Sequence, residues 1–147
     1  MTAIVIERTI ATAPERVFQA LTRADDIGRW WTNDLNITPE VGSLAEFRFG
    51  EWGAFRLRFE LAELTCERIR WLAAPGSPPH WAGTSVTWRL TPTQDGTTLS
   101  FTQEGFAPQV DEAYIGPVRG NWNYFLDSLK SYLETGKGTP GTPPYTR

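Results

Sequence analysis

The sequence predicts a single α+β domain that combines an antiparallel sheet with one long C-terminal helix. Between Asn33 and Glu104, apolar residues alternate with polar ones, and turn residues punctuate the pattern. Between Val110 and Glu134, apolar residues recur every three or four positions. A chain of 147 residues, 40% of them hydrophobic, can bury one core but not two. We expect one domain over residues 1–135.

The chain opens with a strand and two short helices. Residues 3–11 are rich in β-branched side chains and alternate in polarity, which favours a strand. Thr12 and Pro14 mark the start of a first helix, with Thr12 as its cap. Asp25 and Asp26 stand directly before a second apolar segment. They could form a carboxylate pair, but capping of a second short helix is the simpler interpretation.

The central region predicts six or seven strands connected as an antiparallel meander. Apolar side chains occupy every second position, so one face of the sheet is apolar and the other is polar. Turns are expected at Gly50 to Gly53 and at Asp95-Gly96. The same alternation turns Gln103 inward and Glu104 outward.

The last predicted helix is the longest. Its apolar residues lie on one side, as in an amphipathic helix packed on a core. Pro117 marks either its start or a kink close to the start, and Gly136 ends it. Residues 136–147 are short of apolar residues and rich in Gly and Pro, so we expect a disordered tail there.

Composition excludes several classes of function. The net charge of −3 leaves no basic stripe for a nucleic acid. No run of residues approaches the about 18 apolar positions that membrane insertion requires. Cys66 is the single cysteine, which rules out an internal disulfide, and we expect it to be a buried structural thiol. We expect a soluble, cytoplasmic protein.

The sequence offers no catalytic constellation. His80 is the single histidine, so neither a metal cluster nor an imidazole relay can be built around it, and we expect a solvated or packing role. Glycine-rich phosphate loops, metal-spaced Cys/His pairs and nucleophile elbows do not occur. We therefore predict no catalytic residue, no metal ligand and no cofactor, and we favour a protein that is not an enzyme.

Four local patterns occur in a fixed order along residues 3–135. They are Ile10-Ala11-Thr12-Ala13-Pro14-Glu15-Arg16-Val17-Phe18 with Leu21; Trp30-Trp31; Asp95-Gly96-Thr97-Thr98-Leu99 with Glu104-Gly105-Phe106; and Gly120-Asn121-Trp122 with Leu126, Leu129 and Tyr132-Leu133. Their order and spacing resemble the START-related superfamily, also called SRPBCC or birch-pollen-allergen-like. Within it, the chain resembles the branch of homologues of the activator of the ninety-kilodalton heat-shock protein's ATPase. The resemblance implies a helix-grip fold, in which a curved sheet wraps around the C-terminal helix.

The resemblance also implies a cavity between the sheet and the helix, which in this superfamily commonly holds hydrophobic molecules. From the alternation and the helical spacing we expect the cavity to be lined by Trp30, Trp31, Phe47, Leu57, Trp71, Trp88, Phe101, Gln103, Val118, Trp122 and Phe125. Aromatic walls with few polar groups suit a flat apolar ligand. The same side chains could instead fill the space as an ordinary core.

Three hypotheses about function follow. The first is a binder of a small lipid-, polyketide- or aromatic-like molecule. The second is a cyclase- or dehydratase-like enzyme acting on a hydrophobic substrate, which needs at least two polar groups converging inside the cavity. The third is a co-chaperone-like interaction domain with a chaperone as partner, which the family name alone suggests and which the lack of a second domain disfavours.

Overall fold

The computed structural model describes residues 2–50 and 55–141, and its elements follow the predicted order. The strands are β1 (Ile4–Ile10), β2 (Asp34–Asn36), β3 (Leu44–Phe49), β4 (Phe55–Leu64), β5 (Arg68–Ala73), β6 (Ser85–Thr93) and β7 (Gly96–Glu104). The helices are α1 (Pro14–Thr22), α2 (Ala24–Trp30), the short 3₁₀ helix η2 (Pro79–Trp81) and α3 (Glu112–Thr135).

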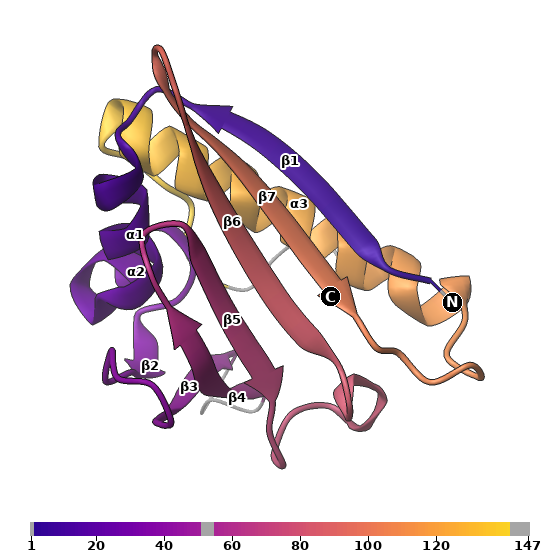
Figure 1. The fold of residues 1–147 in the computed structure, drawn as a ribbon. Helices are drawn as coiled ribbons and strands as arrows, with labels where there is room; N and C mark the ends of the chain where they lie inside the picture. Colours follow the sequence, from indigo (N-terminus) through magenta and orange to yellow (C-terminus); the bar gives the residue numbers. More distant parts are fainter. Residues whose placement is uncertain (1, 51–54, 142–147) are drawn as a thin grey trace.

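The strands form one seven-stranded antiparallel sheet, in the order β1-β7-β6-β5-β4-β3-β2 (Figure 1). Strands β2 to β7 make the predicted meander, and β1 pairs with β7, with Ile6 opposite Phe101. The Asp95-Gly96 turn joins β6 to β7 as expected. The turn expected at Gly50 to Gly53 lies, beyond Gly50, outside the described residues.

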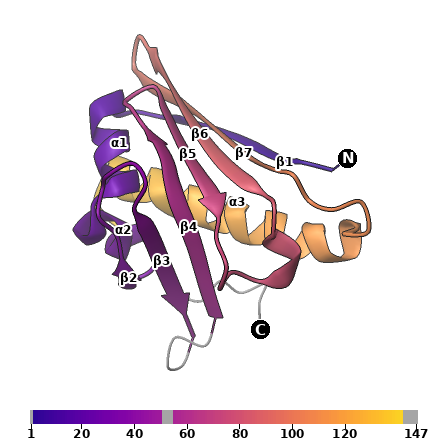
Figure 2. The ribbon, with the colours of Figure 1, turned by 60° about the horizontal axis from the view of Figure 1, so that its bottom comes forward.

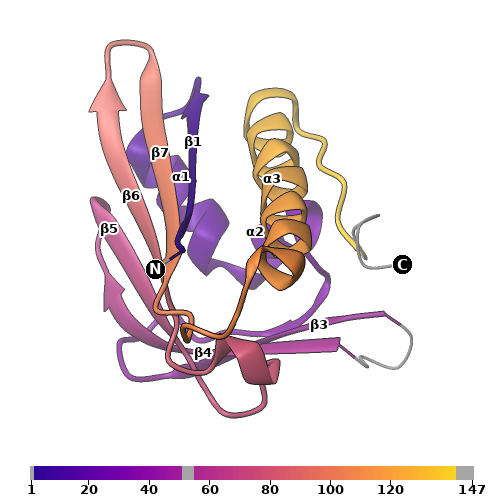
Figure 3. The same ribbon diagram turned by 90° about the vertical axis from the view of Figure 1, so that its right-hand side faces the viewer.

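The sheet is curved, and α3 lies in its concavity. Figure 2 shows α3 crossing the sheet, and Figure 3 shows the strands bending around two sides of the helix. Helices α1 and α2 lie at one end of this concavity, and α3 comes close to β1, α1 and α2. The helix-grip prediction is therefore confirmed.

Alternation along the strands separates a buried face from a polar face, as predicted. In β7, Leu99, Phe101 and Gln103 are buried, whereas Glu104 is exposed. In β3 and β4, Phe47 and Phe59 face the same core from neighbouring strands. The period of two therefore identified the concave face correctly.

Helix α3 begins earlier than Pro117. Asp111 is its N-cap residue, and Pro117 lies inside the helix, so the prediction that Pro117 marks the start was wrong. Pro117 is the sixth residue of α3, so the helix lacks the backbone hydrogen bond that an N–H there would donate to the carbonyl of Ala113. At the other end, Gly136 takes a left-handed conformation with φ of 87°, which ends the helix as predicted.

The capping predictions for the first two helices were wrong. Ala13 and Arg23 are the N-cap residues of α1 and α2, and neither makes a side-chain capping bond. The Thr12 hydroxyl donates instead to the carbonyl of Leu133, at 3.4 Å. Asp26 bonds to side chains of other helices, because long-range partners compete with the local backbone for its oxygens.

Residues 137–141, expected to belong to a disordered tail, return along α3 and α2. The backbone N–H of Gly141 donates to the carbonyl of Trp31, at 2.8 Å, and that of Thr139 donates to the Ser128 hydroxyl, at 2.7 Å. Gly138 fits against α2 so closely that a Cβ there would lie 2.4 Å from the Arg29 carbonyl oxygen. Residues 142–147 lie outside the described part of the chain.

Candidate functional site

The side chains predicted to line a cavity come together between the sheet and α3. Ring centroids lie 4.3 Å apart for Trp31 and Phe47, and 4.5 Å apart for Phe101 and Trp122. Val118 is half-buried, and the other predicted residues are at most 4% exposed: Trp30, Trp31, Phe47, Leu57, Trp71, Trp88, Phe101, Gln103, Trp122 and Phe125. We call this set the aromatic interior. Its role in ligand binding stays a prediction.

Trp31 joins the separate parts of the aromatic interior. It is the C-cap residue of α2, and its indole packs against the concave face of the sheet. Its ring lies 5.5 Å from that of Trp122 in α3 and stacks at 6.1 Å on that of Trp71 in β5. One side chain therefore connects α2, the sheet and α3.

Sequence reasoning missed three rings of this cluster: Phe49, Phe59 and Trp81. Trp81 lies in η2, and its ring is 6.1 Å from both Phe59 and Trp122. A short 3₁₀ helix in a proline-rich loop has no hydrophobic period, so the sequence pattern could not predict that Trp81 is buried. Phe49 and Phe59 did follow the period of two and could have been included.

Gln103 is the polar centre of the interior, and its buried amide is hydrogen bonded on both sides. Its Oε1 accepts the indole N–H of Trp122, at 2.9 Å, and its Nε2 donates to the Thr84 hydroxyl, at 3.3 Å. Thr84 in turn donates to the carbonyl of Trp81, at 2.7 Å. This chain ties η2, β7 and α3 together.

Other polar atoms of the interior have no hydrogen-bond partner in the described structure. They include the indole N–H groups of Trp71 and Trp88, both 0% exposed. The Trp81 N–H has no bond of ordinary geometry either, but it lies near the Tyr114 hydroxyl, where it opposes the rise that burial causes in the pKa of Tyr114. Trp30 behaves differently, because its N–H donates to the carbonyl of Ala20, at 2.8 Å.

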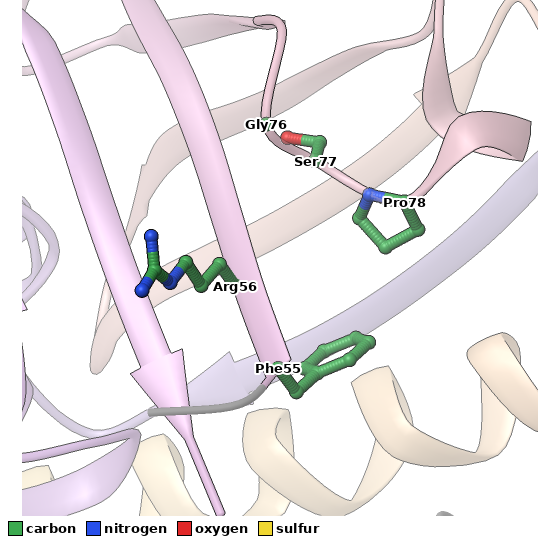
Figure 4. Close-up of a pocket in the computed structure, with 5 residues that line it drawn as sticks. All are labelled: Phe55, Arg56, Gly76, Ser77 and Pro78. Atoms are coloured by element: carbon green, nitrogen blue, oxygen red, sulfur yellow. The ribbon is translucent and has the colours of Figure 1, made fainter. Parts of the chain in front are cut away.

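An open pocket of about 260 Å³ lies where β4 begins, beside the loop that follows β5. Figure 4 shows its lining, with the rings of Phe55 and Pro78 on one side and Arg56 pointing the other way; the residues are Phe55, Arg56, Gly76, Ser77 and Pro78. The Ser77 hydroxyl fixes the loop, since it accepts the N–H of Arg58, at 2.8 Å, and donates to its carbonyl, at 2.7 Å. We call this the rim pocket.

The rim pocket is connected to the aromatic interior through successive rings. Phe55 is 42% exposed, and its ring lies 6.1 Å from that of Phe49. Phe49 is 6% exposed and lies 5.8 Å from Trp31 and 5.7 Å from Phe125. A continuous path of packed rings therefore leads from Phe55 at the surface to the aromatic interior.

A charged cluster joins α1, α2 and α3 at the opposite end of the site. Arg16 donates two hydrogen bonds to the Asp26 carboxylate, at 2.8 and 3.1 Å, and the Tyr132 hydroxyl donates a third, at 2.5 Å. Burial raises the pKa of Asp26, but the bonds from Arg16 and Tyr132 outweigh burial and hold it below its ordinary value. We call this the helix junction, and its geometry is that of a structural clamp.

The remaining candidate groups lie on the surface. His80 is exposed, and its ring rests edge-on against Tyr114, with centroids 4.6 Å apart. Cys66 is exposed in the turn between β4 and β5, so the expectation of a buried thiol was wrong: the turn has no core beneath it. In the part of the chain that the structure describes, no three His, Cys, Asp or Glu side chains gather as a metal site, and no helix combines the length and apolar character needed to cross a bilayer.

The curved sheet, the enclosed C-terminal helix and the aromatic interior together define a helix-grip protein. The chain belongs to the family of Activator of Hsp90 ATPase homolog 1-like proteins, whose family model matches residues 11–134. This match spans the described fold from the end of β1 to the end of α3. The family resemblance seen in the sequence is confirmed.

Solved structures support the same assignment. The Aha1 dimer from Colwellia psychrerythraea is 32% identical with a TM-score of 0.83, and the match covers 94% of this chain and all of that one. Protein MLL2253 from Mesorhizobium loti is 29% identical with a TM-score of 0.76, covering 90% of this chain and 96% of that one. DynU16, from the dynemicin biosynthetic locus, shares the fold at 22% identity and a TM-score of 0.76, covering 92% of this chain and 48% of its own. Comparison with curated proteins gives no match.

Proposed function

We propose that the protein binds a small, flat hydrophobic molecule of lipid-, polyketide- or aromatic-like chemistry, which enters at the rim pocket and rests against the aromatic interior. The observation that carries this proposal is the path from the exposed Phe55 through Phe49 to Trp31. A single exposed apolar side chain on a protein surface is common and needs no explanation. Phe55 differs because it also lines a pocket.

The dimensions of the rim pocket favour a small ligand. Its volume of about 260 Å³ lies just below the range of roughly 300–1,000 Å³ typical of ligand sites. A two- or three-ring compound would cover Phe55 and bury its exposed surface, at roughly 25 cal/mol per Å² of apolar area. Since the aromatic interior is densely packed, a larger ligand gains space by displacing Phe55, the one ring of the path that is substantially exposed.

The two alternative functions have less support. An enzyme needs polar groups converging on the substrate, and the oxygen and nitrogen of Gln103 already bond Trp122 and Thr84. A co-chaperone role rests on the family name alone. We also propose a cytoplasmic location, because a lone exposed thiol such as that of Cys66 stays reduced there.

Titration with fluorene, followed by ¹H–¹⁵N NMR and native mass spectrometry, tests the proposal. We expect saturable one-to-one binding that shifts the amide signals of Phe55, Ser77 and Phe49. Phe55→Ala should weaken binding about fivefold, because the variant loses roughly 1 kcal/mol of apolar contact with the ligand. Val5→Ala is the matched control, since Val5 is 69% exposed on the edge strand β1, which three strands separate from β4.

Two results would contradict the proposal. One is the absence of saturable shifts with fluorene across its solubility range. The other is equal weakening in Phe55→Ala and Val5→Ala, which would mean that fluorene adheres to exposed apolar side chains without using the rim pocket.

A further inference from the structure

We propose that the ligand carries a carbonyl oxygen, or an equivalent hydrogen-bond acceptor, which the indole N–H groups of Trp71 and Trp88 recognise. This inference rests on the proposed function and names the chemical class of its ligand. It starts from two buried donors that have no acceptor in the described structure.

Unpartnered buried donors are rare in proteins and costly to maintain. More than about 90% of buried polar groups have a hydrogen-bond partner, and an orphaned group loses the free energy of its former bond to water. Trp71 and Trp88 are both 0% exposed, so neither side chain contacts bulk solvent. Two such donors side by side therefore require an explanation.

The two donors lie together at the centre of the concave face. Trp71 is on β5 and Trp88 on the adjacent β6, and their rings meet edge to face at 5.4 Å and 64°. Their other ring neighbours carry no free acceptor; they are Trp31, Phe47 and Phe59 around Trp71, and Trp30, Phe101 and Trp122 around Trp88. The rings packed against these two side chains therefore supply no lone pair for either N–H.

Acceptors elsewhere in the interior are already committed. The Gln103 oxygen accepts from Trp122, the Thr84 hydroxyl accepts from Gln103, and the Ala20 carbonyl accepts from Trp30. The remaining buried acceptor without a partner, among the described side chains, is the Oδ1 of Asn121 on α3. Around the aromatic interior, donors in need of a partner thus outnumber acceptors, which favours a ketone or quinone over a hydrocarbon or an amine.

The donors lie on the path from the rim pocket. The rings succeed one another from Phe55 to Phe49 at 6.1 Å, to Trp31 at 5.8 Å and to Trp71 at 6.1 Å. A flat molecule that enters beside Phe55 and moves inward by displacing Phe49 and Trp31 would lie against Trp71. An acceptor on the edge of that molecule would then meet the unpartnered N–H groups.

A different physical account is that each N–H rests on the face of a neighbouring ring. Trp88 meets Phe101 at 73° and Trp122 at 83°, and edge-on geometries of this kind permit weak N–H···π contacts. Such contacts are weaker than a bond to a carbonyl oxygen. The two accounts predict different ligand preferences and can be separated by experiment.

The experiment compares fluorene with 9-fluorenone, which match in ring system and differ by one carbonyl group. We expect the wild-type protein to bind 9-fluorenone about tenfold more tightly, the value of one buried hydrogen bond. In the double variant Trp71→Phe/Trp88→Phe this preference should fall to about one. Trp30→Phe is the comparison variant: it removes another buried indole of the aromatic interior and should weaken both compounds alike, because the Trp30 N–H is already bonded, so the preference for 9-fluorenone should remain.

A measurement on the wild-type protein avoids dependence on the stability of the variants. The indole N–H signals of Trp71 and Trp88 should move downfield on addition of 9-fluorenone and stay nearly in place with fluorene, while that of Trp30 stays in place with both. Equal affinities for the two compounds, with both indole signals unmoved, would overturn the inference and leave the proposed function standing. Failure of both compounds to bind would overturn the proposed function and this inference with it.

Discussion

The aromatic interior and the helix junction hold the same α3 in different ways. In the junction, Asp26 receives hydrogen bonds from both Arg16 and Tyr132. In the interior, rings fill the space and two indole N–H groups have no partner. Directional bonds therefore dominate at the helix junction, whereas in the aromatic interior the bond from Trp122 to Gln103 is surrounded by non-directional apolar contacts.

This difference suggests a division of roles between the two regions. Hydrogen bonds and ion pairs have narrow geometric optima, so the junction resists rearrangement. Apolar packing depends mainly on buried area and tolerates exchange of one flat partner for another of similar volume. A binding site is expected in the region whose contacts can be exchanged.

The largest effect is expected from Trp31→Ala, which removes the ring that joins α2, the sheet and α3. Loss of a buried aromatic side chain should lower the free energy of unfolding by about 3–5 kcal/mol, through lost transfer energy and a cavity. Urea denaturation measures it, with Trp31→Phe as a milder variant in case Trp31→Ala does not fold. A loss below about 1 kcal/mol in both would show that the interior contributes less than we infer.

The fold and most of the interior could be predicted from the sequence because both depend on local periodicity. A period of two identified Phe47, Trp71, Trp88 and Phe101, and helical spacing identified Trp122. Phe49 and Phe59 obeyed the same rule, so their omission was a fault of selection.

The helix junction could not be predicted, because its partners are distant in the chain. Asp26 looked like a helix cap, but its partners Arg16 and Tyr132 lie 10 and 106 positions away. The burial of Trp81 could not be predicted for a related reason, since it depends on the packing of η2 against Phe59 and Trp122, which are distant in the chain.

The next effect in size is expected from Asp26→Asn, which removes the charge of the helix junction. The Asp26 side chain is 12% exposed but that of Arg16 is 40% exposed, so solvent screening limits the loss to about 1–2 kcal/mol of unfolding free energy. Asp25→Asn is the matched control. The Asp25 side chain is next to Asp26 in the sequence but is exposed, so this substitution should change the free energy of unfolding by less than about 0.5 kcal/mol. Equal effects of the two substitutions would contradict the clamp.

The pH dependence of the same pair gives a signature specific to the charge. Asp26 has a lowered pKa in the folded protein, so its stabilising effect is full above the ordinary value of 3.8. It is lost as the pH falls through the folded pKa, below 3.8. The stability difference between wild type and Asp26→Asn should therefore be constant from pH 7 to about pH 5 and shrink toward pH 2. A difference that stays constant down to pH 2 would assign the effect to packing.

The smallest effect is expected from Ser128→Ala, at the place where the two regions meet. The Ser128 hydroxyl donates to the Trp30 carbonyl at the end of α2, at 2.7 Å, and accepts the N–H of Thr139, at 2.7 Å. Its loss leaves both backbone groups without their partner and should cost about 1 kcal/mol, reduced by the higher helix propensity of alanine.

Ser131→Ala, which removes an exposed bond to the Lys137 carbonyl, has the same propensity gain and should be nearly neutral. In Ser128→Ala, amide exchange of Thr139 and Gly141 should quicken, because the segment that returns to Trp31 loses an anchor. Unchanged exchange at both amides would mean that residues 137–141 are held without Ser128. The polar contacts would then fix α3 at the helix junction, and the end of α2 would depend on the burial of Trp30 and Trp31 in the aromatic interior.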